Sequence, residues 1–207
     1  LDRYECRKQL IDYLKENDLI EKIEPYKLAK ATCYRCHQAV EPMISKQWFM
    51  NMDDVAKQAL EAVDNGELEI VPNRVEKIYR HWLTNIRDWC ISRQLWWGHR
   101  IPAYYCEECD NVMVETTAPH TCSKCGSTKL HQEEDVLDTW FSSALWPFST
   151  LGYPEQTEDL NRFFPTTTLV TAQDIIFFWV ARMVMLSKKT MNTIPFSKVL
   201  INGIVRD

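Results

Sequence analysis

Residues 166–203 read TTTLVTAQDIIFFWVARMVMLSKKTMNTIPFSKVLING, and this stretch decides the fold class. The β-branched run at 166–170 predicts a strand, the apolar stretch at 173–187 predicts a helix, and residues 198–201 predict a second strand. A strand, a helix and a strand at this spacing form a βαβ unit, which implies a parallel sheet with a right-handed crossover. The sequence therefore predicts an α/β fold.

Periodicity and capping signals predict further elements on both sides of this unit. The predicted helices cover residues 4–17, 53–63, a stretch from 73 onward, and 136–145, which Pro147 ends. The predicted strands cover residues 68–71 and 101–105.

The carboxyl ends of the two strands in the βαβ unit are the expected place for a ligand, because open α/β sheets bind their ligands there. The N-terminus of the intervening helix can face a phosphate or a carboxylate, and a glycine lets a ligand lie against the backbone. The residues at this edge are Thr171, Ala172, Gln173, Asp174, Asn202 and Gly203.

Two tryptophans near this edge have two possible roles. Ile175 and Trp179 are four residues apart on the predicted helix, so both can approach one cavity. From spacing alone, packing against the sheet is the favoured role for Trp179, and Trp140 has the same two alternatives. Asp135 and Asp138 are either ligands or charges at a helix start, which the helix dipole favours.

The cysteines give the strongest local signal for chemistry. Six of the eight cysteines fall into three CxxC pairs, which favours metal binding before disulfides. Twelve residues separate Cys106-x2-Cys109 from Cys122-x2-Cys125, and two such turns close a tetrahedral zinc shell. Because no coordination position stays open, the zinc ion is expected to be structural.

The third pair, Cys33-x2-Cys36, is a half-site. It can take a second CxxC pair from outside this chain, use His37 as a third ligand, or bind no metal. The sequence leaves these three alternatives open.

Composition describes a globular chain, with 45% hydrophobic and 26% charged residues among 207. The net charge of −5 argues against a free-standing RNA-binding protein, which would be basic. The longest apolar run, residues 175–181, is too short to span a bilayer, so no membrane association is expected. The chain starts at Leu1 and stops at Asp207 directly after a strand-like run, so an internal fragment of a longer protein is expected.

Four blocks of sequence resemble the class I aminoacyl-tRNA synthetases. ISRQLWWGHRIP at 91–102 is similar to the block that the valine, isoleucine and leucine enzymes share after their editing insertion. DVLDTWFSSALWP at 135–147 and DIIFFWVARM at 174–183 resemble the valine-type versions. VLINGIVRD at 199–207 resembles the strand that leads into the KMSKS loop. Together these blocks indicate the valyl-tRNA synthetase family.

The resemblance implies four regions. Residues 1–47 would be the C-terminal end of the editing insertion and its stem with the CxxC half-site, and residues 48–103 a helical connective segment. Residues 104–130 would form a zinc-ribbon-like four-cysteine module, and residues 131–207 the second half of a Rossmann-type catalytic domain. The HIGH and KMSKS motifs lie outside these residues, so the chain is expected to be inactive alone.

The resemblance also implies an activity and its site. The parent enzyme would activate valine with Mg·ATP to valyl-adenylate and transfer the valyl group to tRNA(Val), as a monomer in the cytoplasm. Trp140, Trp179 and Ile175 would form the valine pocket. The residues bordering the adenylate would be Thr171, Ala172, Asp174 and Gly203. No residue here would be a general acid or base. The family commonly has glycine at the position of Ala172 and histidine at that of Asn202.

Two other interpretations compete with this one. An isoleucyl-tRNA synthetase shares the block at 91–102, but the two valine-type blocks count against it. A non-catalytic zinc-ribbon protein that binds a partner or RNA would need only the cysteine module.

Overall fold

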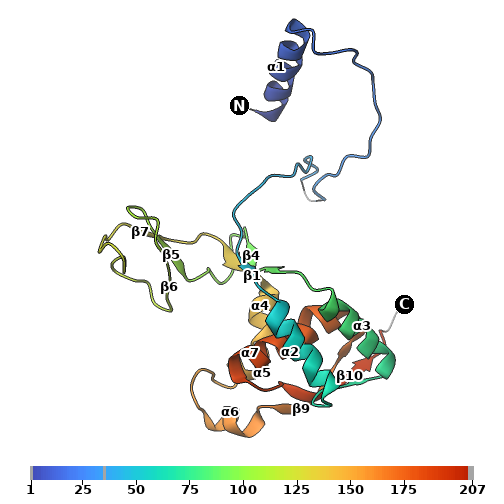
Figure 1. The fold of residues 1–207 in the computed structure, drawn as a ribbon, viewed down its shortest axis with the longest axis vertical. Coiled ribbons are helices and arrows are strands. Elements are labelled where there is room, and N and C mark those ends of the chain that lie inside the picture. Colours follow the sequence, from blue (N-terminus) through green and yellow to red (C-terminus); the bar gives the residue numbers. More distant parts are fainter. Residues whose placement is uncertain (1, 35, 205–207) are drawn as a thin grey trace. The chain divides into compact units, whose positions relative to one another are not determined.

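The structure is a computed structural model that describes residues 2–34 and 36–204. The end of the block at 199–207 lies outside the described residues. The chain divides into two compact units, Leu1–Ser45 and Lys46–Asp207 (Figure 1).

The first unit contains the helix α1 (Arg3–Glu16), which confirms the helix predicted at 4–17. Asp2 caps this helix, because its carboxylate accepts a hydrogen bond from the backbone N–H of Tyr4 at 2.8 Å. None of the described residues of α1 is buried within the unit. The rest of the described part of this unit is mainly extended chain, with a turn that begins at Cys33 and an isolated bridge between Thr32 and Ala39.

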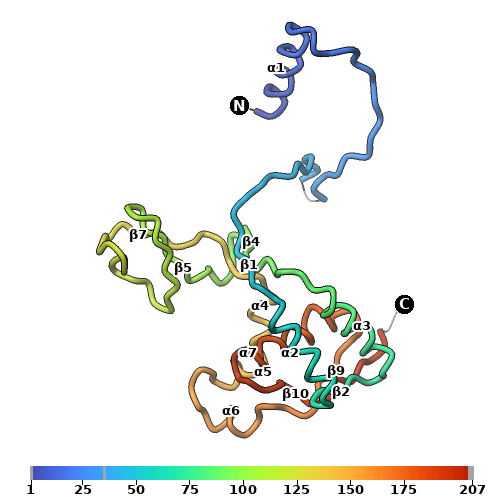
Figure 2. Tube along the Cα trace, in the orientation of Figure 1, coloured from blue at the N-terminus to red at the C-terminus, as the bar shows by residue number. Residues whose placement is uncertain are grey.

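A three-stranded parallel sheet forms the centre of the second unit. Its order is β2 (Glu69–Val71), β10 (Phe196–Asn202) and β9 (Thr166–Ala172), and β10 is parallel to both neighbours. Figure 2 traces β2 beside β10 although more than a hundred residues separate them. The pairing of β9 with β10 confirms the βαβ unit and the parallel sheet that the sequence predicts.

The connection between β9 and β10 differs from the single helix predicted at 173–187. It contains a 3₁₀ turn η1 (Gln173–Ile175), a π-helical segment η2 (Ile176–Ala181) and the α-helix α7 (Arg182–Met191). In η2, Phe177 stacks on Trp82 with ring centroids 4.7 Å apart, while Trp179 donates a hydrogen bond to the carbonyl of Ser143. Phe177 and Trp179, two residues apart, thus contact residues of two different helices. Such π-type turns are rare and are frequent at functional sites.

Two further helices complete the core of this unit. They are α2 (Asp53–Asp64), which buries small side chains such as Ala59 and Ala62, and α3 (Asn73–Thr84), which buries Val75 and Tyr79. Together with α7 they cover one face of the sheet, where Val199 of β10 has no exposed surface. This arrangement gives the parallel sheet a continuous hydrophobic core.

Short paired segments connect the core to the cysteine module. β1 (Phe49–Met50) pairs with β3 (Trp89–Cys90), and β4 (Ser92–Arg93) pairs with β8 (Val136–Leu137), both antiparallel. The helix predicted at 136–145 is therefore wrong at its start, because residues 136 and 137 belong to β8.

Three short helices follow, α4 (Thr139–Ala144), α5 (Trp146–Ser149) and α6 (Glu158–Phe163). The prediction that Pro147 ends the helix at 136–145 is wrong, because α4 already ends at Ala144 and Pro147 lies inside the first turn of α5. A proline is tolerated there because the N–H that it lacks has no partner within the helix.

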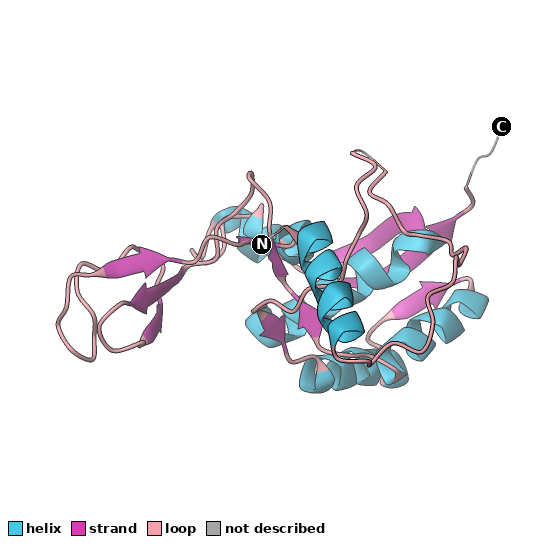
Figure 3. Cartoon of the chain, turned by 90° about the horizontal axis from the view of Figure 1, so that it is seen from above, coloured by secondary structure: helices cyan, strands magenta, loops and turns pink. Residues whose placement is uncertain are grey.

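The four cysteines lie on a separate antiparallel sheet, with one in a strand and three in the loops between its strands. It consists of β6 (Val112–Val114), β5 (Ala103–Cys106) and β7 (Leu130–Gln132) in that order, and its strands are drawn in magenta in Figure 3. Its core cluster contains Cys106, Met113 and Cys122. Over the described part of the chain, every helix falls short of the length and apolarity needed to cross a bilayer.

Candidate functional site

Four thiols form a compact group that fits one metal ion. The Sγ atoms of Cys106, Cys109, Cys122 and Cys125 all lie within 4.8 Å of one another. Two of the separations are 3.5 Å, between Cys106 and Cys125, and 3.6 Å, between Cys109 and Cys122. A tetrahedral ion with bonds of ~2.3 Å to sulfur requires edges of about 3.8 Å. The structure therefore brings together the four ligands that the spacing predicted.

Backbone hydrogen bonds shape the second CxxC turn for metal binding. The N–H of Cys122 donates to the carbonyl of Ser127 at 2.8 Å, and the N–H of Gly126 donates back to the carbonyl of Cys122 at 2.9 Å. Gly126 has φ +74°, a value that glycine adopts without steric cost. Hydrogen bonds from the N–H groups of Cys125 and Lys124 lower the pKa of the Cys122 thiol to about 6. A lowered pKa favours the thiolate of Cys122, which is the form that binds metal. Backbone hydrogen bonds at Asn111 and Ser127 also lower the pKa of the Cys109 and Cys125 thiols, but burial and hydrogen bonds with the neighbouring thiols outweigh them and raise both pKa values.

The same backbone geometry occurs in all three CxxC turns. At Cys106 the two equivalent bonds are 3.0 Å each, and Asp110 has φ +53°. At Cys33 the N–H donates to the carbonyl of Gln38 at 2.8 Å, the N–H of His37 donates back at 2.8 Å, and His37 has φ +58°. The backbone hydrogen bonds at Cys33 and His37 thus match those of the two turns that hold the four-cysteine group.

The third turn does not form a complete metal site within the described part of the chain. There, the only group of three or more potential ligands that can share an ion is the four-cysteine group. Cys33, Cys36 and His37 do not form a second such group. His37 instead occupies the turn position that has positive φ.

The carboxyl edge of the parallel sheet brings the predicted ligand-bordering residues together. Ala172 at the end of β9 is opposite Asn202 at the end of β10, and Thr171 beside it is buried. Gly203 is exposed, and no heavy atom lies within 4 Å of the place where a Cβ would be. Asp174 is exposed in η1. The edge is therefore open to a ligand.

The two candidate tryptophans, Trp140 and Trp179, lie on α4 and η2, and a hydrogen bond joins these two elements. Trp140 lies in the first turn of α4 and stacks on Phe178 of η2 with ring centroids 5.8 Å apart. Trp179 of η2 donates from its indole Nε1 to the backbone carbonyl of Ser143 in α4 at 3.1 Å. Both tryptophans and Ile175 are only half-buried, although the two indoles pack against the core. Partial exposure suits the wall of a pocket better than a position inside the core.

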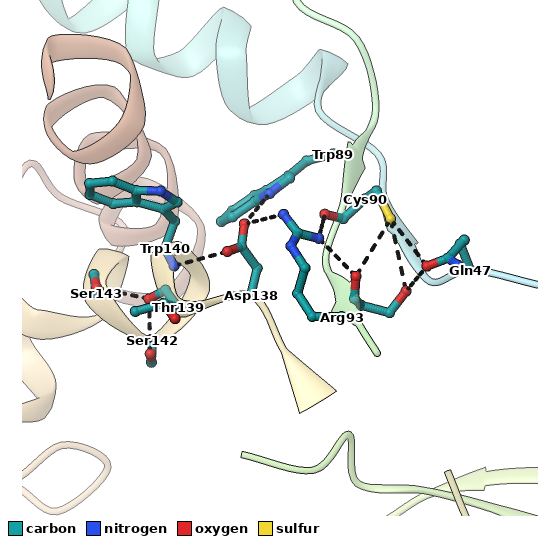
Figure 4. A network of polar contacts seen from close by, with 10 residues as sticks. Gln47, Trp89, Cys90, Arg93, Asp138, Thr139, Trp140, Ser142 and Ser143 are labelled. Atoms are coloured by element: carbon teal, nitrogen blue, oxygen red, sulfur yellow. Dashed lines mark hydrogen bonds and ion pairs between the residues drawn. The ribbon is translucent and has the colours of Figure 1, made fainter. Parts of the chain in front are cut away.

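A buried polar network, which spacing could not predict, lies at the start of α4 (Figure 4). The Oδ2 atom of Asp138 accepts hydrogen bonds from Trp89 Nε1 at 3.0 Å and from Arg93 Nη2 at 2.8 Å. Its Oδ1 atom accepts a longer bond from the backbone N–H of Trp140 at 3.4 Å. Asp138 is thus the N-cap of α4, which confirms the helix-start role among its two predicted alternatives.

A second carboxylate links the small sheet to the rest of its unit. Glu133 accepts hydrogen bonds at its Oε2 atom from the Tyr105 hydroxyl at 2.7 Å and from Trp48 Nε1 at 3.0 Å. Burial raises the pKa of Glu133, but hydrogen bonds from these two side chains and from the backbone N–H groups of Asp135 and Glu134 together hold the pKa below its usual value.

Comparison with known proteins identifies the class to which this chain belongs. A family model described as tRNA synthetases class I (I, L, M and V) matches residues 14–207. The chain therefore belongs to the class I tRNA synthetases. Over all 207 residues it is 56% identical to the valine–tRNA ligases of Thermotoga maritima and Clostridium perfringens. It covers 24% of each of these relatives, so it spans about a quarter of their length.

Solved structures agree on the fold. Methionyl-tRNA synthetase of Mycobacterium tuberculosis bound by methionyl-adenylate superimposes with a TM-score of 0.55 at 14% identity, covering 86% of this chain and 30% of that chain. The apo form of that enzyme gives a TM-score of 0.57 at 14% identity, with 84% and 30% covered. Because the family match extends far beyond the cysteine module, a free-standing zinc ribbon is not favoured. The identity to valine–tRNA ligases also counts against an isoleucine enzyme.

Proposed function

We propose that this chain is part of a valine–tRNA ligase, which activates valine with ATP to valyl-adenylate and transfers the valyl group to tRNA(Val). The single observation that carries the proposal is the 56% identity to valine–tRNA ligases along the entire chain. Within that enzyme, residues 131–207 are the second half of a Rossmann-type catalytic domain. The parallel pairing of β9 with β10 supports this assignment.

Trp140, Trp179 and Ile175 form the pocket for the valine side chain. Their partial burial and the hydrogen bond from Trp179 to α4 support this role, because a pocket wall must be both accessible and fixed. An apolar pocket of fixed size excludes isoleucine by its bulk. It rejects threonine poorly, because threonine and valine have nearly the same shape.

The adenylate lies along the open edge of the sheet. Thr171, Ala172, Asp174 and Gly203 border it, and the open space at Gly203 supports close approach of a ligand to the backbone. Magnesium enters with ATP as its companion ion. Activation depends on positioning and on stabilisation of charge, so none of these residues needs to act as a general acid or base.

Zinc is the metal that suits the four-cysteine centre. Four thiolates in a closed tetrahedral group are typical of a structural zinc ion. Cys33 and Cys36 form half of a second zinc site, whose other ligands come from a segment outside this chain. Their turn has the same backbone hydrogen bonds as the two turns of the four-cysteine centre, which supports this assignment. In the full-length protein, Cys33→Ser should lower the zinc content by one ion per molecule.

The remaining regions follow from the same proposal. Residues 1–47 are the end of the editing insertion with its stem, residues 48–103 a connective segment, and residues 104–130 the zinc module. The chain alone is inactive, because it spans about a quarter of its relatives and does not contain the HIGH and KMSKS motifs. The whole enzyme is a cytoplasmic monomer.

Aminoacylation by the full-length protein, meaning the natural polypeptide that contains these residues, tests the proposal. It should charge tRNA(Val) with valine, and Trp179→Ala should raise the KM for valine on the order of tenfold or more. Phe163→Ala is the matched control, because Phe163 is an exposed aromatic residue on α6 and outside the pocket. Equal effects of the two substitutions would contradict the assignment of the pocket.

A further inference from the structure

Asp138 is a buried carboxylate that connects three segments of the chain. Its side chain is only 8% exposed, and a buried charge is costly unless it is paired and hydrogen-bonded. The compensating partners come from β3, through Trp89, from β4, through Arg93, and from the first turn of α4. Packing alone does not require a carboxylate here, so its charge and its acceptor geometry point to a specific role.

A buried cation occupies the other side of Trp89. The guanidinium carbon of Arg182 lies 3.9 Å from the centre of the Trp89 ring, with Phe177 and Phe178 at 5.4 and 5.6 Å. Its Nη1 atom is buried and has no hydrogen-bond partner among the described residues. Burial lowers the pKa of Arg182 to about 10, and Asp138 opposes this effect by its charge. Trp89 thus lies between a cation that contacts its face and a carboxylate that binds its N–H.

This network reaches the proposed valine pocket directly. Asp138 caps α4 two residues before Trp140, and Trp179 binds the carbonyl of Ser143 towards the other end of that six-residue helix. Trp140 also stacks on Phe178, which is one of the rings around Arg182. Figure 4 shows the carboxylate of Asp138 below the indole of Trp89, with dashed lines to Trp89, Arg93 and the backbone nitrogen of Trp140. A change at Asp138 would therefore shift the first turn of α4, and with it the indole of Trp140.

We propose that Asp138 is a positioning residue for amino-acid recognition: it fixes the indole of Trp140 through the cap of α4. Trp89 and Arg93 both donate to its Oδ2 atom and hold Asp138 in place, and Arg182 packs on the ring of Trp89. The inference rests on the proposed function, because it assigns Trp140 to the amino-acid pocket. Asp138 does not contact the substrate. It sets the width of the pocket, and hence the affinity for valine and the discrimination against a larger side chain.

Amino-acid-dependent pyrophosphate exchange with the full-length protein tests this role. Asp138→Asn keeps the size of the side chain and removes its charge, and Trp89→Phe keeps the aromatic ring and removes its N–H. Both variants should raise the KM for valine, by about tenfold or more for Asp138→Asn, with little change in the KM for ATP. Exchange with isoleucine relative to valine should rise. Asp64→Asn is the matched control, because Asp64 pairs with Arg80 on the surface at 2.6 Å.

A second measurement reports on Trp140 without any substrate. In protein labelled with fluorotryptophan, the resonance of Trp140, assigned through Trp140→Phe, should shift or broaden in Asp138→Asn and Trp89→Phe but not in Asp64→Asn. An unchanged Trp140 resonance would overturn the inference, and so would a loss of kcat with unchanged KM for valine. If the unmodified protein activates another amino acid, the proposed function fails, whereas the effect of Asp138 on Trp140 is still decided by the resonance.

Discussion

Replacing Cys106 with serine should release the small cysteine sheet without unfolding the α/β core. The core cluster of that sheet contains one buried side chain other than cysteine, Met113, whose burial contributes about 1.5–3 kcal/mol. A structural zinc ion in a small domain contributes about 10–16 kcal/mol. The metal therefore outweighs the core of the module several-fold. A serine hydroxyl is a poor replacement for a thiolate ligand, so most of this contribution should be lost.

The loss of structure should be confined to the small cysteine sheet and should not reach the parallel sheet. The hydrophobic cluster around the parallel sheet contains no residue of the small sheet, from β5 to β7. Hydrogen exchange measured by mass spectrometry should therefore show rapid exchange of the amides that close the two turns, those of Asp110 and Gly126. The amides of β10 should remain protected. The same pattern should appear when a chelator removes the metal from the unmodified protein.

Two results would refute this reasoning. Retained protection of the module in Cys106→Ser would mean that the metal is not what stabilises it. Loss of protection throughout β9 and β10 would mean that the module and the core unfold as one unit. Lys124→Ala is a suitable control, because it alters an exposed side chain in the second turn and leaves the four thiols intact.

Four further substitutions test the fold and the site. Phe196→Ala, at the buried first position of β10, should lower the free energy of unfolding by about 3–5 kcal/mol, whereas Leu200→Ala, whose side chain is 42% exposed, should cost much less; urea denaturation distinguishes them. Trp179→Phe removes the hydrogen bond to Ser143 and should cost about 0.5–1.5 kcal/mol in the same assay. Glu133 stabilises the fold when it is ionised, because its pKa is lowered, so this stabilisation should be lost as the pH falls below the usual carboxyl value of 4.5. Glu133→Gln should remove this dependence, and an unchanged pH profile of the melting temperature would contradict it.

The features that the sequence predicted well are those with local signals. The β-branched run before residue 171 and the apolar stretch after it are sufficient for a βαβ unit, because each periodicity is read within a few residues. The four metal ligands are equally local, since each CxxC turn presents two thiols to one point. The family resemblance also rested on short blocks of sequence, such as residues 91–102 and 135–147, and the comparison with known proteins confirmed it.

The features that the sequence did not predict depend on contacts between distant residues. No local pattern indicates that Trp89 and Arg93 meet the carboxylate of Asp138 almost fifty residues later. The sequence predicts a helix at residues 136 and 137. They form a strand instead, because their conformation depends on pairing with β4, which is distant in the sequence. The π-helical segment at 176–181 likewise depends on anchors outside the segment, in α3 and α4. Tertiary contacts override local preference at these positions.

The most direct test of the central claim is amino-acid-dependent pyrophosphate exchange, measured with the full-length protein and with residues 1–207 alone. We expect strong exchange with valine, weak exchange with threonine, almost none with isoleucine, and none from the isolated chain. A preference for isoleucine would assign the protein to the isoleucine branch of the class I synthetases. Valine-dependent exchange by residues 1–207 alone would contradict the claim that the catalytic site is incomplete in this chain.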